Sequence, residues 1–208
     1  ELIKRNRHDY CRMGISEDLM WILASASPRR KQLLTRAGAH FTVITPEYRE
    51  RNRSEHAPAA LVQEQALGKA RAGTAISHMP QLAVLGADTL VVCDDTVFGK
   101  PRDREMAKTM LTALGGRTHH VVTGLALLLP SGEAITRAIT TEVKMERWPQ
   151  ALLETYLAGD EWTDKAGAYA IQGTAALMIS DIAGSYTNVV GLPLHATYRL
   201  LTENGVEW

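Results

Sequence analysis

The sequence predicts an α/β protein in which helices flank a mixed β-sheet. In the first half of the chain, short apolar runs alternate with amphipathic segments, an order that favours parallel strands joined by helices. In the second half, two strand-like runs are joined by Pro130-Ser131-Gly132-Glu133, which is typical of the turn of an antiparallel hairpin. Neither an internal repeat nor a linker rich in Pro, Gly or Ser divides the chain, so we expect one domain.

The strand predictions follow from apolar runs that are bounded by turn residues. The longest run covers residues 82–93, and Asp94-Asp95 would turn it back into a short partner at residues 96–98. Further strands are predicted at residues 21–24, 41–45, 121–129 and 134–143, and two short ones after a glycine-rich loop at residues 159–173.

Proline, glycine and capping residues mark the predicted helices. Ser27 is a good N-cap and Pro28 suits the first helical position, so a helix is expected from there to Gly38. Pro58 begins a long helix that reaches about residue 76. Three more helices are predicted: one from Pro101 and Asp103 to Gly115-Gly116, one at residues 149–158 and one at residues 193–202.

The charge balance excludes a broadly basic surface. The 208 residues include 23 Lys plus Arg and 23 Asp plus Glu, a net charge of zero, which argues against a nucleic-acid partner. With 45% hydrophobic and 22% charged residues, the composition is that of a globular protein. Since apolar runs stay short of the roughly 18 residues that a membrane span needs, no membrane association is expected.

The first 19 residues show no periodicity and lack the apolar core of a signal peptide. We expect them to be an extension outside the fold, with residues 20–208 forming the single domain. The two cysteines, Cys11 and Cys93, are too few for a disulfide framework or a metal cluster. This favours a reducing compartment and predicts a cytoplasmic protein.

The strand-to-helix junction at residues 25–30 is the first candidate site. Ser25 and Ser27 lie beyond the predicted strand end, and the first amides of the helix would point the same way. A helix N-terminus that carries Arg29 and Arg30 favours a bound phosphate or carboxylate. The local pattern fits equally well with a capped helix whose arginines are solvated.

Asp88 is the best catalytic candidate, because a carboxylate within the apolar run 82–93 is costly unless it is paired, metal-bound or open to a cleft. A structural aspartate that pairs with a neighbouring helix is the alternative. Lys100 follows the predicted hairpin and could return to the same sheet edge, or be an ordinary surface lysine. Lys69 lies among small residues on the long helix, which indicates close packing, although helical lysines are usually solvated.

Two further motifs contain residue types that are common in binding sites. Gln172 lies between Gly167 and Gly173 in a segment that could let the backbone approach a ligand, or could simply be a tight turn. The adjacent His119 and His120 would face opposite sides of a strand, which excludes an easily shared metal ion. The motifs of P-loop kinases, zincins and hydrolases with a nucleophile elbow are missing from the sequence.

Six segments, taken in order, resemble the Maf family of nucleoside triphosphate pyrophosphatases. They include Gly86-Ala87-Asp88-Thr89 and cover residues 23–30, 69–70, 86–89, 99–101, 164–173 and 190–193. The resemblance runs from about Trp21 to the C-terminus. It implies a bilobal Maf/ITPase-like α/β fold with a central cleft, a homodimer, and hydrolysis of a nucleoside triphosphate to monophosphate and pyrophosphate with Mg²⁺ or Mn²⁺.

Carried over position by position, the resemblance makes Asp88 the proton acceptor of the reaction. Arg29, Thr89 and Gln172 match the positions that govern substrate choice. Lys69 and Lys100 match the family's cleft lysines, and Ser25 and Ser27 lie in the substrate-binding segment that carries Arg29.

One departure concerns the metal. The family usually has two consecutive acids in the loop after the second strand, whereas this chain has Arg49-Glu50. A guanidinium repels Mg²⁺ instead of ligating it, so we predict that Glu50 is the metal-binding residue.

The form of segment 164–173 resembles the branch of the family that acts on dTTP and UTP. This predicts these nucleotides, and modified pyrimidine nucleotides, as substrates. Two alternatives stay open: the same chemistry on 7-methyl-GTP, and a non-catalytic nucleotide-binding regulator of cell division, which the substitution at Arg49 would permit.

Overall fold

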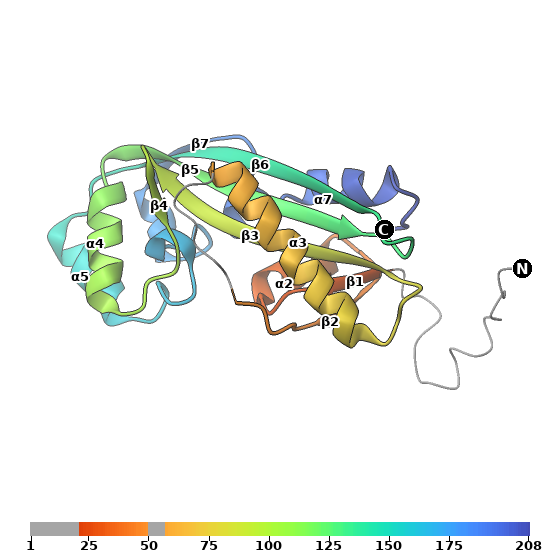
Figure 1. The fold of residues 1–208 in the computed structure, drawn as a ribbon. Helices are drawn as coiled ribbons and strands as arrows, with labels where there is room; N and C mark the ends of the chain where they lie inside the picture. The colour runs from red at the N-terminus through yellow and green to blue at the C-terminus, as the bar shows by residue number, and fades with distance from the viewer. Residues whose placement is uncertain (1–20, 50–56) are drawn as a thin grey trace, which may run out of the picture.

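The structure is a computed structural model that describes residues 21–49 and 57–208 (Figure 1). Two predictions therefore lie outside the described residues: the N-terminal extension at residues 1–19, and the metal-binding role of Glu50.

The described residues form one mixed sheet of seven strands, which confirms the predicted α/β class. The order is β2-β1-β3-β5-β6-β7, with β4 paired to β3. Strand β1 is parallel to β2 and β3, whereas β3, β5, β6 and β7 run antiparallel in turn, as the alternating first half and the hairpin in the second half predicted. The strands are β1 Trp21–Ala24, β2 Phe41–Ile44, β3 Ala83–Cys93, β4 Thr96–Phe98, β5 Arg117–Leu128, β6 Ala134–Met145 and β7 Ile179–Ala183.

The helices begin and end near the predicted capping residues. The side chain of Ser27 accepts a hydrogen bond from the Arg30 amide, that of Asp103 accepts one from Met106, and Gly38 follows the first helix at φ 73°. The helices are α2 Pro28–Arg36, α3 Pro58–Ser77, α4 Arg104–Leu114, α5 Gln150–Ala158, α6 Tyr186–Val190 and α7 Leu194–Thr202, with 3-10 turns η1 Ala166–Ala168 and η2 Thr174–Met178. Among the described helices, none is long and apolar enough to cross a membrane.

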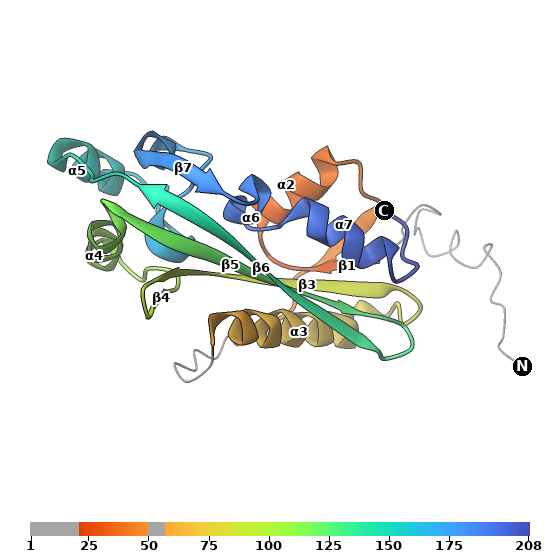
Figure 2. The ribbon, with the colours of Figure 1, turned by 90° about the horizontal axis from the view of Figure 1, so that it is seen from above.

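Helix α3 lies on one face of the sheet, and α2, α6 and α7 lie on the other (Figure 2). Two glycines allow α3 to approach the strands closely. A Cβ at Gly86 of β3 would lie 2.1 Å from the Ala66 carbonyl oxygen, and one at Gly124 of β5 would lie 2.2 Å from that of Val62. Backbone therefore packs directly on backbone here, which holds the middle of α3 against β3.

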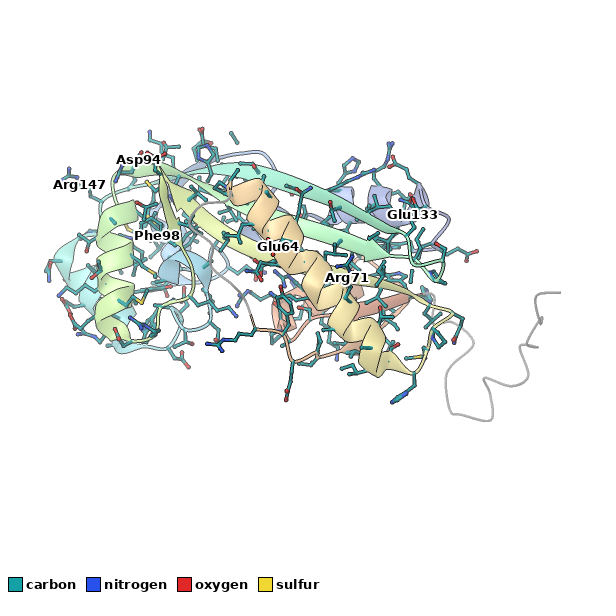
Figure 3. The ribbon with its side chains drawn as sticks, viewed as in Figure 1. Glu64, Arg71, Asp94, Phe98, Glu133 and Arg147 are labelled. Atoms are coloured by element: carbon teal, nitrogen blue, oxygen red, sulfur yellow. The ribbon has the colours of Figure 1, made fainter. Side chains whose placement is uncertain are left out.

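Two hydrophobic clusters lie toward opposite ends of the long strands. One joins β1, α2 and α7 around Trp21 and Leu85. The other joins α4 and α5 to the far ends of β3, β5 and β6, and Phe98 of β4 packs against it (Figures 1 and 3). This arrangement agrees with the expected bilobal shape.

One element differs from the prediction. Two short strands were expected after the glycine-rich loop, but the described residues contain one, β7, followed by helix α6. The sequence of α6, Tyr-Thr-Asn-Val-Val, has β propensity, yet Ser185 caps it by accepting from the Asn188 amide at 3.2 Å. The buried Asn188 side chain also donates to the Val121 carbonyl at 3.0 Å, so capping and tertiary hydrogen bonds override propensity.

Candidate active site

A cleft of about 730 Å³ opens between the end of β1, the start of α2, the middle of β3 and the segment at residues 164–172. It brings together every predicted site residue that the structure describes. They are Ser25, Ser27, Arg29, Lys69, Asp88, Thr89, Lys100 and Gln172.

Asp88 forms an ion pair with Lys69, with 2.6 Å between Oδ1 and Nζ. The close approach of α3 at Gly86 brings the two together, because residues 86 and 88 face the same side of β3. Asp88 is 5% exposed. The alternative prediction, an aspartate paired with a neighbouring helix, is thus observed, and the same pair lies on the cleft wall, so the two interpretations coexist.

Arg30 differs from both interpretations of the helix start. It is 8% exposed, and four of the five N–H groups of a guanidinium donate to protein oxygens. Nε donates to the Gly191 carbonyl at 2.8 Å, and Nη1 donates to Ser25 Oγ at 3.3 Å and to the Ala87 carbonyl at 2.9 Å. Nη2 donates to Thr89 Oγ1 at 3.0 Å. Arg30 is therefore neither solvated nor aimed outward as an anion ligand.

Arg29 does face the cleft, where Lys165 accompanies it. Burial lowers the pKa of Arg29, and the charge of Asp164 opposes this shift. Burial also lowers the pKa of Lys165, and the positive charge of Arg29 adds to the effect. Two cations held together in a partly buried place favour an anion between them. Lys165 was missed at the sequence level, although it lies in the 164–173 segment that carries the family resemblance.

The segment that carries Gln172 is held in an uncommon backbone conformation. Gly167 and Ala168 have φ values of 70° and 63°, and Ala168 is fully buried. The hydroxyl of Tyr156 donates to the Ala168 carbonyl at 3.2 Å, and the Gly167 amide donates to the Gly99 carbonyl at 3.1 Å. The structure thus shows a tight turn, and this turn places Gln172 at the cleft.

The two adjacent histidines lie on opposite faces of β5, as predicted. His119 is fully buried with Nε2 2.8 Å from the Tyr169 hydroxyl, whereas His120 is exposed. Burial lowers the pKa of His119 to about 4, and the neighbouring His120 adds to the effect. Within the described part of the chain, no group of three or more His, Cys, Asp or Glu residues that could hold a metal ion is found.

The charge of the cleft is strongly positive. Its described lining contains five basic residues and two acidic ones, an excess of three positive charges (5 − 2) in a chain whose net charge is zero. The basic residues are Arg29, Arg30, Lys69, Lys100 and Lys165, and the acidic ones are Asp88 and Asp164.

A mixed α/β sheet with a cationic cleft around a buried carboxylate defines a protein that binds small polyanions, with a group placed to act on them. The chain belongs to the Maf family, since the model of this family, described as Maf-like protein, matches residues 20–204.

The matches between this chain and its curated relatives cover nearly the whole length of those relatives. A dTTP/UTP pyrophosphatase of Symbiobacterium thermophilum is 47% identical over 184 residues, which are 88% of this chain and 93% of that protein. A dTTP/UTP pyrophosphatase of Shewanella denitrificans is 44% identical over 189 residues, 88% of this chain and 95% of that protein. A crystal structure of a nucleoside-triphosphatase / dITP/XTP pyrophosphatase from Mycobacterium abscessus covers 62% of this chain and 74% of that one, at 20% identity and a TM-score of 0.39.

Proposed function

We propose that this chain hydrolyses dTTP, UTP and modified pyrimidine nucleotides to the nucleoside monophosphate and pyrophosphate. The observation that carries the proposal is the cleft, whose described lining combines five basic residues with the buried carboxylate of Asp88. The similarity to dTTP/UTP pyrophosphatases at 44–47% identity supports the choice of nucleotide.

The proposed roles follow from charge and position. A triphosphate brings about four negative charges, which Arg29, Lys100 and Lys165 offset in a partly buried site where such contacts are strong. Asp88 orients and deprotonates the attacking water, and Lys69 holds the carboxylate in place. The remaining proposed contacts to the nucleotide come from Ser25, Ser27, Thr89 and Gln172.

We further propose Mg²⁺ or Mn²⁺ as cofactor. Mg²⁺ is usually held by one or two carboxylates together with substrate phosphates, so a site with few protein ligands fits it. Glu50, which lies outside the described residues, is the proposed metal ligand, and Asp88 keeps its role as the base at the cleft. When bound, the ion neutralises charge on the phosphates.

The proposal includes a cytoplasmic homodimer without a nucleic-acid or membrane partner. The even charge balance argues against a nucleic-acid partner, the two cysteines support the location, and the family resemblance supports the dimer.

Pyrophosphate release tests the function. The full chain is incubated with dTTP, UTP, CTP, 5-methyl-UTP and 7-methyl-GTP in Mg²⁺ or Mn²⁺, and pyrophosphate and orthophosphate are measured separately. We expect pyrophosphate from the uracil and thymine nucleotides. Preferred cleavage of 7-methyl-GTP would support the alternative substrate. Nucleotide binding without pyrophosphate release would favour a non-catalytic regulator. Orthophosphate in place of pyrophosphate would contradict the cleavage position.

A further inference from the structure

The hydroxyl of Thr89 is surrounded by protein groups. Its Oγ1 lies 3.0 Å from Arg30 Nη2, 2.9 Å from Thr123 Oγ1 and 3.5 Å from the carbonyl oxygen of Gly191. A hydroxyl has one proton to donate and two lone pairs to accept with, and Arg30 and Thr123 lie nearer to it than Gly191 does.

The chemistry of the neighbours limits the directions in which the proton of Thr89 can point. A guanidinium only donates, so Arg30 takes one lone pair of Oγ1. The Gly191 carbonyl only accepts, and Thr123 can do either. If the Thr89 proton points at Thr123 Oγ1, which is the nearer acceptor, one lone pair of Thr89 is left for a ligand; if it points at Gly191 and Thr123 donates, none is left.

A fixed hydroxyl has a consequence for a bound base. A hydroxyl that rotates freely can donate to one base edge and accept from another, so it distinguishes poorly between them. With its proton held by Thr123 and one lone pair taken by Arg30, the Thr89 hydroxyl can only accept a hydrogen bond from a base. Uracil and cytosine differ in this respect, because N3 of uracil carries a proton and N3 of cytosine does not.

Thr123 lies behind Thr89 and outside the cleft. It is directly opposite Thr89 in the β3–β5 register, it is fully buried, and it does not belong to the cleft lining. A nucleotide in the cleft would therefore not touch Thr123, and any influence of Thr123 on base choice has to act through Thr89.

We propose that Thr123, together with Arg30, is a positioning residue for base selectivity: the two fix the orientation of the Thr89 hydroxyl, and this fixed orientation separates uracil from cytosine nucleotides. The inference rests on the proposed function, in which Thr89 faces the nucleotide. Thr123 suits the test better than Arg30, since Thr123→Val has nearly the same shape and removes one contact instead of four.

The test measures binding of the non-hydrolysable α,β-imido analogues of UTP and CTP to the full chain by titration calorimetry. The wild type is expected to prefer the uracil analogue. Losing one hydrogen bond of about 1 kcal/mol should reduce this preference about fivefold in Thr123→Val. Thr123→Ser keeps the hydroxyl and should retain the preference. Thr123→Ala replaces the valine variant if thermal unfolding shows that the latter does not fold.

A double-mutant cycle tests whether Thr123 acts on base preference through Thr89. Thr89→Val alone should reduce the preference, and the pair Thr89→Val with Thr123→Val should reduce it no further, because both changes act on one contact. Additive losses, an unchanged preference in Thr123→Val, an equal loss in Thr123→Ser, or no preference in the wild type would each overturn the inference. Selective binding without pyrophosphate release would refute the hydrolysis and leave the inference intact. Pyrophosphate release with no effect of the Thr123 variants on base preference would refute the inference and leave the hydrolysis intact.

Discussion

Asp88 combines burial with a charge partner, and its carboxylate is the group on which the proposed chemistry depends. Replacing it by asparagine preserves the shape of the side chain but removes its capacity to take a proton. We expect Asp88→Asn to lower kcat for UTP about 10²-fold or more while the thermal unfolding midpoint shows that the fold persists. The matched control is Asp95→Asn, an exposed aspartate at the β3–β4 turn, which should leave kcat unchanged. Near-normal turnover in Asp88→Asn would remove this residue from the mechanism.

His119 links stability to pH. Its pKa is lowered from 6.5 to about 4 in the folded chain, so between these values the unfolded chain binds a proton that the folded chain does not. The contribution of His119 to the free energy of unfolding is therefore complete above pH 6.5 and is lost as the pH drops toward 4. The total loss from this residue is on the order of 3 kcal/mol.

The measurement for His119 is urea unfolding at pH 7 and pH 4.5. We expect His119→Asn, whose amide can still bond the Tyr169 hydroxyl, to lose less stability between the two pH values than the wild type. The exposed neighbour supplies the control, and His120→Asn should keep most of the wild-type pH dependence, because burial is the larger cause of the lowered pKa of His119. A pH dependence in His119→Asn as large as that of the wild type would show that His119 is not the titrating group.

At the scale of elements, the contact between α3 and β3 fixes the geometry of Asp88. A methyl group at Gly86 would lie 2.1 Å from the Ala66 carbonyl oxygen and 2.8 Å from the Ala70 nitrogen, both of which are backbone atoms. We expect Gly86→Ala to cost about 1–3 kcal/mol of stability, as overpacking does, and to lower kcat because Lys69 moves relative to Asp88.

Denaturant unfolding and UTP turnover check this prediction together. Gly159→Ala is the control, because its Cβ would lie at an ordinary 3.6 Å from the Tyr156 carbonyl oxygen and Gly159 is not part of the described cleft lining. Gly86→Ala with unchanged stability would mean that the helix can shift without cost, and the packing argument would fail.

The elements show which features a sequence can predict. Strands and helices bounded by Pro, Gly or a capping side chain were predicted within a few residues, because these signals are local. Helix α6 was missed, since Asn188 bonds to strands β5 and β6 that are distant in sequence. Among site residues, the cost of burying a carboxylate identified Asp88. The different surroundings of Arg29 and Arg30 were not predictable, because they depend on carbonyl groups of Ala87 and Gly191.

For the whole molecule, the zero net charge does not reveal the charge of the cleft. The zero net charge holds for the complete sequence, but the described cleft has an excess of three positive charges, so acidic residues must predominate elsewhere. Composition excluded a broadly basic surface, and it could not reveal a local cluster of this size.

The extension at residues 1–19 gives a prediction for the whole chain. The family match begins at residue 20, and the predicted domain covers residues 20–208. We expect deletion of residues 1–19 to leave the thermal unfolding midpoint and pyrophosphate release within error of the full chain. Circular dichroism and the release assay measure these two quantities. A clear fall in either would assign the segment a part in folding or binding.

The lengths of two neighbouring strands have a consequence for the cleft. Strand β1 has four residues and pairs with β3 only as far as Gly86, whereas β3 has eleven residues and meets β4 from Val91 onward. Among the described strands, residues 87–90 are paired on the β5 side alone, and Arg30 takes the Ala87 carbonyl that a longer β1 could have bonded. The cleft is thus a notch in the sheet, produced by an early strand end. Residues inserted after Ala24 that extended β1 would fill this notch, so the active site depends on where one strand stops.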